Sequence, residues 1–279
     1  MTKIILASRH SGHATATPAI KTRIEQEIED PEYVVVTDHN DEYDYSFAEK
    51  VYRVPSFRPT GGKIYRPLRT LKNFYRSWRI LRKERPEKVL AYGANTSFPI
   101  GLIAGLTGTE VIAVEAENRT KKPSLTPKML SKLSGTRVWV SHDELLDKYD
   151  TERVENKQII QFRDFSDHKS EEKDNQLLII PSSNDPELQE KYWKDISHDK
   201  FLDLIGRTDT VVTRGGMTSY EAANLAEKVV VRPSSHAGGH QQNFSEWLEK
   251  EYENVEVLKD KSFEQLVEEY EEKRDEQRT

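Results

Sequence analysis

The stretch DTVVTRGGMTSYEAANLAEKVVVRP, residues 209–233, contains a strand, a turn, a helix and a second strand in succession. DTVVT and KVVVRP are short β-branched runs typical of buried strands, and the segment between them has the pattern of a helix. Two strands joined through a helix lie parallel in one sheet. The glycine pair Gly215 and Gly216 marks the turn at which the helix begins. This unit predicts an α/β fold with a parallel sheet.

The same alternation continues through both halves of the chain. Strands are predicted at residues 3–8, 33–37, 50–54, 88–92, 110–115, 137–141, 177–182, 209–213, 228–233 and 254–258, and helices at 18–29, 67–85, 99–106, 127–133, 198–205, 218–225, 242–253 and from 262 onward. Residues 163–175 are charged and aperiodic, which predicts a linker. We therefore expect two Rossmann-like, doubly wound domains, 1–162 and 176–279. The carboxyl ends of their strands are expected to face a common cleft, where open α/β sheets bind ligands.

Composition excludes several kinds of chemistry. The 279 residues include no cysteine, so disulfides, thiolate nucleophiles and cysteine-ligated zinc are excluded, as suits a reducing compartment. No secretory signal is recognised at the start, and the longest apolar region, 98–108, has about half the roughly 20 residues that a membrane span needs. We expect a soluble protein inside the cell.

Charge is distributed unevenly over the chain. The net charge is -6, yet residues 63–88 hold ten basic residues and only two acidic ones. Apolar residues recur among them at near-helical spacing, which predicts an amphipathic helix. Its apolar side packs in the core while the arginines stay solvated, or it docks on an anionic bilayer, and both can be partly true. The membrane-binding candidates are Arg69, Lys72, Arg76, Trp78 and Arg79. No recognised nucleic-acid-binding module accompanies this charge.

The loops of the second half predict a nucleotide-sugar site. Free amides at the start of the helix after Gly215 and Gly216 favour an anion, and glycine lets a phosphate approach closely. Glu221, one turn further on, is placed to accept hydrogen bonds from a ribose. Amide and imidazole groups bind sugar hydroxyls with directional hydrogen bonds. The donor-site candidates are Ser182, Gly215, Gly216, Thr218, Glu221, His240, Gln241, Gln242 and Asn243. Ordinary turn and cap roles remain the alternative for each of them.

The loops of the first half supply candidates for the acceptor side. His13, in the turn after the first strand, is a candidate general base because histidine titrates near neutrality; it is equally suited to capping the next helix. Glu115 is a second candidate base. Charge at the end of a strand is rarely needed for folding, which singles out the segment with Glu115, Glu117, Asn118 and Arg119. The acceptor-binding candidates are Gly12, Asn95, Asn118 and Arg119. The cluster DHND, 38–41, is expected to be a solvated turn, and no metal site is predicted.

With these motifs assembled, the chain resembles the GT-B glycosyltransferases that act on polyprenol-linked sugars. Residues 209–243 are similar to the donor domain of the lipid II N-acetylglucosaminyltransferase and to the catalytic subunit of the transferase that adds the second N-acetylglucosamine to dolichyl diphosphate. The segments RPEKVLAYGANTSFP and VEAENRTKKPSLTPKMLSKLSGTRVWVSHDEL are similar to the membrane-recruiting partner of that subunit. The whole resembles the two subunits fused in one chain.

The resemblance implies an inverting transfer, without metal or cofactor, from UDP-N-acetylglucosamine to a lipid-linked acceptor at the inner face of the cell membrane. It implies that Gly215, Gly216 and Thr218 hold the diphosphate, Glu221 the ribose, and Gln241 with Gln242 the sugar. His13, Glu115 and Arg119 match acceptor-side positions. A homodimer is compatible with this scheme. A UDP-sugar epimerase and a noncatalytic nucleotide-sugar-binding module that recruits another transferase remain alternative functions.

Overall fold

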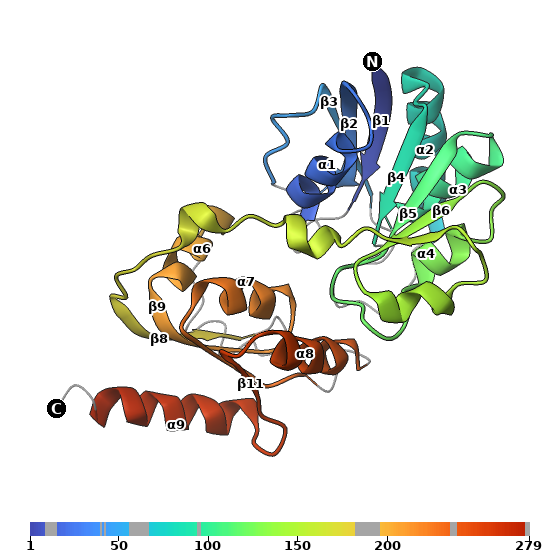
Figure 1. The fold of residues 1–279 in the computed structure, drawn as a ribbon. Coiled ribbons are helices and arrows are strands. Elements are labelled where there is room, and N and C mark those ends of the chain that lie inside the picture. The colour runs from blue at the N-terminus through green and yellow to red at the C-terminus, as the bar shows by residue number, and fades with distance from the viewer. Residues whose placement is uncertain are drawn as a thin grey trace. The chain divides into compact units, whose positions relative to one another are not determined.

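The computed structural model describes residues 1–8, 16–39, 41, 43–55, 67–93, 96–181, 196–234 and 239–276. The chain divides into two compact units, Met1–Arg163 and Asp164–Thr279. Each unit is built on one parallel sheet with helices beside it (Figure 1). Both therefore have the α/β architecture that the alternation of strands and helices predicts.

The first unit contains a seven-stranded sheet in the order β3-β2-β1-β4-β5-β6-β7. Its strands are β1 (Thr2–Ala7), β2 (Pro31–Asp38), β3 (Lys50–Val54), β4 (Lys88–Tyr92), β5 (Glu110–Val114), β6 (Arg137–Val140) and β7 (Val154–Asn156). All neighbouring pairs are parallel. The order reverses between β1 and β4, which is the switch point at which doubly wound sheets bind ligands. Strand β7 is not predicted from the sequence, because three residues show no periodicity.

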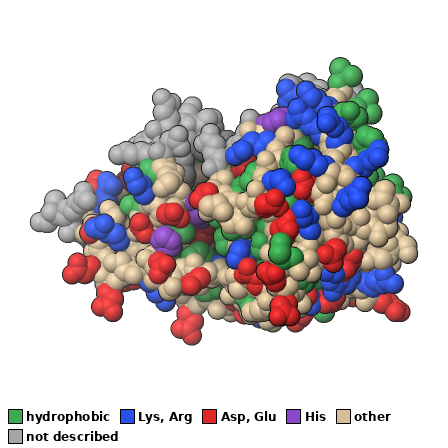
Figure 2. All heavy atoms as spheres, turned by 90° about the horizontal axis from the view of Figure 1, so that it is seen from above, with side chains coloured by type: hydrophobic (Ala, Val, Ile, Leu, Met, Phe, Trp, Pro, Cys, Tyr) green, Lys and Arg blue, Asp and Glu red, His purple; other side chains and the backbone are tan. Residues whose placement is uncertain are grey.

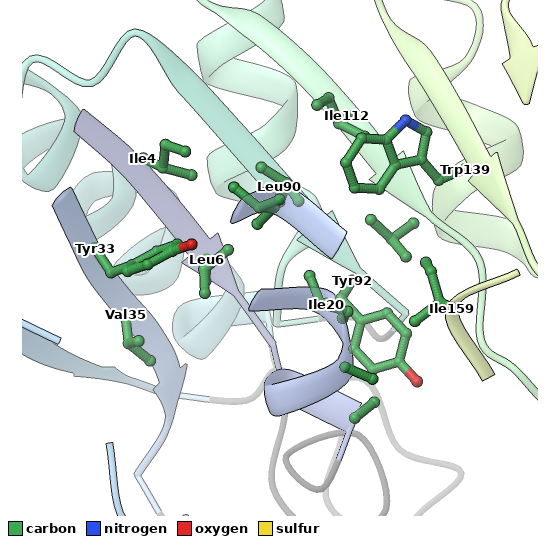
Figure 3. Packing of buried hydrophobic residues seen from close by; sticks show 14 of the residues in the cluster. Ile4, Leu6, Ile20, Tyr33, Val35, Leu90, Tyr92, Ile112, Trp139 and Ile159 are labelled. Carbon is green, nitrogen blue, oxygen red and sulfur yellow. The ribbon is translucent and has the colours of Figure 1, made fainter. Parts of the chain in front are cut away.

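Helices cover the two faces of this sheet. They are α1 (Thr17–Glu25), α2 (Pro67–Glu84), α3 (Phe98–Leu106) and α4 (Leu125–Leu130), with the 3-10 turns η2 (Asp143–Lys148) and η3 (Ile159–Phe162). Side chains alternate between the faces of a strand, so neighbours in β1 belong to different cores. Ile4 belongs to a core that also contains Ile20 of α1 and, across β4 and β5, Trp139 of β6 (Figure 3). Ile5 packs with Ile80 of α2 on the other face.

The second unit contains a four-stranded parallel sheet in the order β11-β10-β9-β8. The strands are β8 (Asn175–Ile180), β9 (Thr208–Thr213), β10 (Lys228–Val231) and β11 (Val255–Val257); the helices are α6 (His198–Gly206), α7 (Met217–Leu225), α8 (His240–Glu251) and α9 (Phe263–Glu276). Val212 and Val230 of the central strands pack against Phe263 and Leu266 of α9. The strands β9 and β10 are neighbours, so the loops that follow them leave the sheet side by side.

The aperiodic segment 163–175, predicted to be a linker, makes several contacts in the structure. The ammonium of Lys173 donates to the carbonyl oxygens of Gly206 (2.7 Å) and Leu225 (2.9 Å). The imidazole of His168, in the 3-10 turn η4 (Ser166–His168), lies 2.6 Å from the carboxylate of Asp203. Gly206 leaves room for the backbone carbonyl of His168, which would overlap any Cβ atom at that position. The segment therefore packs on the second unit, through contacts that leave no periodic signal.

The prediction of a solvated turn at 38–41 is wrong for the two aspartates. Asp38 and Asp41 are both buried. The Asp41 carboxylate accepts hydrogen bonds from the hydroxyls of Thr37 and Tyr45 and from the amide of Tyr43. These bonds replace water around the charge, and a buried carboxylate needs such partners.

Candidate functional site

The turn between β9 and α7 is shaped by one glycine. Gly215 has φ of 84°, in the left-handed region that favours glycine, and its amide donates to the hydroxyl of Ser219 at 3.0 Å. Helix α7 begins at Met217, with Gly216 as its N-cap. The first amides of a helix have no partner within it. Since the Gly215 amide is already bonded, Gly216, Met217 and Thr218, all half-buried, are the residues whose amides are expected to be available to a ligand.

The first turn of helix α8 lies against this same turn. A Cβ atom on Gly216 would lie 4.0 Å from Nε2 of Gln241, and one on Gly215 would lie 3.4 Å from the Gln241 carbonyl oxygen and overlap Oγ of Ser245. The Ser245 hydroxyl donates to that carbonyl at 2.8 Å, and the amide of Ser234 donates to Oε1 of Gln241 at 3.3 Å. The N-termini of α7 and α8 are thus brought together. Their combined dipoles favour a negatively charged group.

The remaining donor-side candidates lie around this meeting point. Glu221 of α7 is buried, with its carboxylate 3.6 Å from Nε2 of His198 at the start of α6. The Gln242 amide is exposed and donates along its own helix to Glu246 at 3.3 Å. His240 and Asn243 are half-buried in the first turn of α8. Ser182 lies outside the described residues, and the ligand contacts of the whole set stay predictions.

Ser245 and His198 are not among the sequence candidates, although the structure places both at this site. Ser245 follows Gln241 by four residues, which is the helical spacing that allows its hydroxyl to reach the Gln241 carbonyl. That spacing could have indicated Ser245. Only the packing of α6 beside α7 brings His198 to Glu221, so the sequence contains no local signal for it.

Glu115 organises the loop after β5. Its buried carboxylate accepts hydrogen bonds from the amides of Ala116 (2.8 Å) and Ser124 (2.7 Å) and from the hydroxyls of Ser124 (2.6 Å) and Tyr149 (2.6 Å). Burial, together with the charge of Glu115, raises the pKa of the Tyr149 hydroxyl well above its usual value, so this group stays a donor. The arrangement favours a structural role for Glu115, and its role as a base stays a prediction.

Glu117 shows that charge after this strand does serve folding, contrary to the expectation from sequence. Its fully buried carboxylate binds the guanidinium of Arg163 at 2.7 Å and 3.1 Å, and its carbonyl oxygen lies 2.6 Å from Nε2 of His142. Asn118 and Arg119, by contrast, are half-buried. They remain the acceptor-side candidates that the structure describes, because Gly12, His13 and Asn95 lie outside the described residues.

Helix α2 presents four of its large apolar residues outward, while Ile80 and Leu81 near its end are buried. Leu68, Leu71, Tyr75 and Trp78, called here the apolar stripe, are 80%, 66%, 57% and 41% exposed. The side that packs on the sheet instead carries Asn73 and Ser77, both fully buried: Asn73 donates to the carbonyl of Pro55 (3.0 Å) and Ser77 to Asn73 (3.1 Å). Blue Lys and Arg side chains lie beside green hydrophobic ones at the upper right of the face shown in Figure 2. Core packing therefore does not explain the stripe.

Within the described ranges, no three His, Asp or Glu side chains lie close enough together to hold a metal ion. In the same part of the chain, no helix combines the length and the apolar composition needed to cross a bilayer.

No protein-family model matches the chain. It is similar to the UDP-N-acetylglucosamine--N-acetylmuramyl-(pentapeptide) pyrophosphoryl-undecaprenol N-acetylglucosamine transferase of Coxiella burnetii, with 26% identity over 135 residues. This match covers 47% of the chain and 37% of the relative, so the chain matches little more than a third of the curated relative's length.

Solved structures share the fold over nearly the whole chain. MurG of Acinetobacter baumannii matches with a TM-score of 0.61 and 14% identity, covering 97% of this chain and 90% of its own. A putative UDP-N-acetylglucosamine 2-epimerase from Listeria monocytogenes matches with a TM-score of 0.64 and 13% identity, covering 96% and 86%. The epimerase of Neisseria meningitidis bound to UDP-GlcNAc gives 0.61 and 13%, covering 96% and 90%. The prediction of two Rossmann-like α/β domains is confirmed; the common cleft between them stays a prediction.

The close approach of Gly215 predicts unequal effects for two adjacent glycines. Gly215→Ala should lower the free energy of unfolding by about 1 to 3 kcal/mol, because it adds left-handed strain and a clash with Ser245. Gly216→Ala is the matched control, because Gly216 has φ of -93° and open space around the added methyl. Urea unfolding measures both variants. Equal losses for the two would show that the turn does not depend on the Gly215 conformation.

Proposed function

We propose that this chain is an inverting glycosyltransferase that moves N-acetylglucosamine from UDP-N-acetylglucosamine to a polyprenyl-(di)phosphate-linked acceptor. The observation that carries the proposal is the meeting of the N-termini of α7 and α8 at Gly216 and Gln241. A diphosphate is the group that two such helix ends suit best. The transferase of Coxiella burnetii, the curated relative, supports the reaction class.

In this proposal the second unit binds the donor. The amides of Gly216, Met217 and Thr218 and the Thr218 hydroxyl donate to the diphosphate. The side chain of Gln241, held beside the turn, donates to the sugar. Glu221 accepts from the ribose, and the neighbouring His198 keeps its carboxylate in place. No metal takes part, because the helix N-termini and the amides stabilise the charge that develops on the departing diphosphate.

The first unit is proposed to bind the acceptor and to remove its proton. A hydroxyl oxygen of the acceptor sugar attacks the anomeric carbon, the bond from that carbon to the diphosphate oxygen breaks, and UDP leaves. Arg119 and Asn118 are proposed to contact the acceptor. His13 is proposed as the base that takes the hydroxyl proton, since the four bonds accepted by Glu115 occupy that carboxylate.

Helix α2 is proposed to bring the enzyme to its lipid-linked substrate at the inner face of the cell membrane. The apolar stripe would enter the acyl boundary of the bilayer, while Arg69 and Lys72 attract anionic lipids. Exposed apolar side chains that lie together on one helix mark an interaction surface. Trp78 is suited to the interface between headgroups and acyl chains, where one end of its ring is apolar and the other meets water.

Loss of the Gln241 side chain should weaken donor binding. Gln241→Ala is expected to raise the Kd for UDP-N-acetylglucosamine about tenfold, because one hydrogen bond to the sugar is lost. Isothermal titration calorimetry measures this change. Lys250→Ala, on the exposed last turn of the same helix, is the control and should leave the Kd unchanged. The assigned role of Gln241 fails if both variants bind the donor as the wild type does.

A product assay separates the three functions considered for this chain. Incubation of the protein with UDP-N-acetylglucosamine and a prenyl-diphosphate sugar should yield UDP and a lipid product longer by one sugar, detected by mass spectrometry. An epimerised nucleotide sugar with no change in the lipid would replace the proposal by the epimerase function that the fold also supports. Donor binding with neither product would identify a noncatalytic binding module.

Removing the apolar stripe should release the protein from membranes. Leu68→Ser with Leu71→Ser is expected to lower sedimentation with phosphatidylglycerol vesicles several-fold, because both side chains lose their apolar contact with the bilayer. Leu68→Met with Leu71→Met keeps the surface apolar and should bind as the wild type does. If the serine variant binds vesicles as strongly as the methionine variant, α2 does not dock through its stripe.

A further inference from the structure

A pocket of about 730 Å³ lies in the first unit, between the edge strand β3 and helix α2. Its described lining consists of His39, Tyr52, Arg53, Val54, Arg76, Trp78, Arg79, Ile80, Arg82 and Lys83. None of the residues proposed to bind the donor or the acceptor is among them. The pocket therefore needs an explanation of its own.

The pocket carries strong positive charge without compensation. Five of its lining residues are cationic at neutral pH, namely Arg53, Arg76, Arg79, Arg82 and Lys83, and none of the described lining residues is acidic. No ion pair joins these five to any carboxylate among the described residues. Elsewhere in the same unit basic residues are paired, as Lys3 is with Glu32 (2.6 Å) and Arg137 with Glu110 (2.9 Å). Converging cations of this kind create a potential that attracts an anion.

Several contacts hold the cations in place. Nη1 of Arg76 lies 2.9 Å from Nε2 of His39 and 3.3 Å from the carbonyl oxygen of Arg53. Burial lowers the pKa of His39, and the positive charge of Arg76 lowers it further. The ring is therefore neutral at neutral pH and accepts the hydrogen bond from Arg76. The guanidinium of Arg82 lies 5.0 Å from the ring centre of Trp78, and Nζ of Lys83 lies 5.6 Å from that of Tyr52. The positive groups are thus held at the pocket by hydrogen bonds and aromatic rings.

The size and lining of the pocket define the ligand class. Sites for small organic molecules have about 300 to 1,000 Å³, whereas a single inorganic phosphate would leave most of this space empty. Guanidinium groups match the geometry of phosphate oxygens and bind them in bidentate pairs. The rings of Tyr52 and Trp78 offer apolar surface to the organic part of a ligand. These features together favour an organic phosphate.

We propose that the pocket between β3 and α2 binds the phosphate group of an organic phosphate, supplied either by the headgroup of an anionic phospholipid or by a soluble phosphorylated metabolite. The proposal does not depend on the glycosyltransferase function. It also differs from docking through the apolar stripe, with which the pocket shares Trp78, since it assigns a defined site with a chemical preference to the basic side of α2.

Two variants of equal charge test the proposal. Arg79→Gln with Lys83→Gln removes two lining cations, neither of which has a hydrogen-bond partner among the described residues, so the fold should persist. Lys128→Gln with Lys132→Gln removes two exposed cations of the same unit that lie outside α2 and do not line the pocket. Glycerol 1-phosphate is titrated into each full-length variant by calorimetry, and sedimentation with phosphatidylglycerol and phosphatidylcholine vesicles runs in parallel. Thermal unfolding checks the fold.

The pocket variant should lose about tenfold or more of the affinity in at least one arm, and the control less than threefold, because charge-assisted hydrogen bonds are lost only in the pocket. A loss in the calorimetric arm identifies a soluble phosphate as the source. A loss confined to phosphatidylglycerol vesicles identifies a lipid headgroup. Equal losses in the two variants, or no binding by the wild type in either arm, overturn the proposal. Because neither variant changes a residue proposed to bind the donor at α7, failure here is distinct from failure of the transferase proposal.

Discussion

The contact between Gly215 and the first turn of α8 is the constraint on which the candidate donor site depends. A side chain at this position would overlap Ser245, and the left-handed conformation of Gly215 turns the chain into α7. The two helix N-termini can therefore approach each other closely. The parallel pairing of β9 with β10 supports the same geometry, because it brings successive loops to one edge of the sheet.

The buried carboxylates of Glu115 and Glu117 stabilise the fold of the first unit. The carboxylates of Glu115 and Glu117 follow β5 directly and are satisfied by hydrogen bonds and by Arg163. Transfer of an ion out of water costs several kcal/mol unless such partners replace the solvent. The loops that carry Asn118 and Arg119 are thereby fixed, which is what a binding surface at the end of a strand requires. Arg163 is the last residue of the first unit, and its ion pair with Glu117 anchors the end of that unit to its core.

Helix α2 carries an exposed apolar surface and a basic surface side by side. Its contact with the sheet uses Ile80 and Leu81 together with the hydrogen-bonded pair Asn73 and Ser77, so the remaining apolar residues stay outside. Exposure of large apolar side chains is unfavourable in water by about 25 cal/mol per Å², which favours a nonaqueous partner for the stripe. The basic side of the same helix lies over β3 and forms the pocket with Arg53 and His39. Membrane docking and anion binding are proposed for neighbouring surfaces of one helix, and these surfaces meet at Trp78.

The sequence by itself determined which segments become strands and helices. Strands β3 and β4 have the predicted bounds, and α2 ends one residue earlier, because hydrophobic periodicity and turn residues act over short distances. It also indicated the glycine turn at Gly215 and the loop around Gln241. Tertiary structure alone decided which side of α2 is buried, that Asp41 is enclosed, and that 163–175 packs on the second unit. The reason is physical: burial and pairing depend on what lies opposite a residue, and for His198 and Glu221 that partner is distant in the chain.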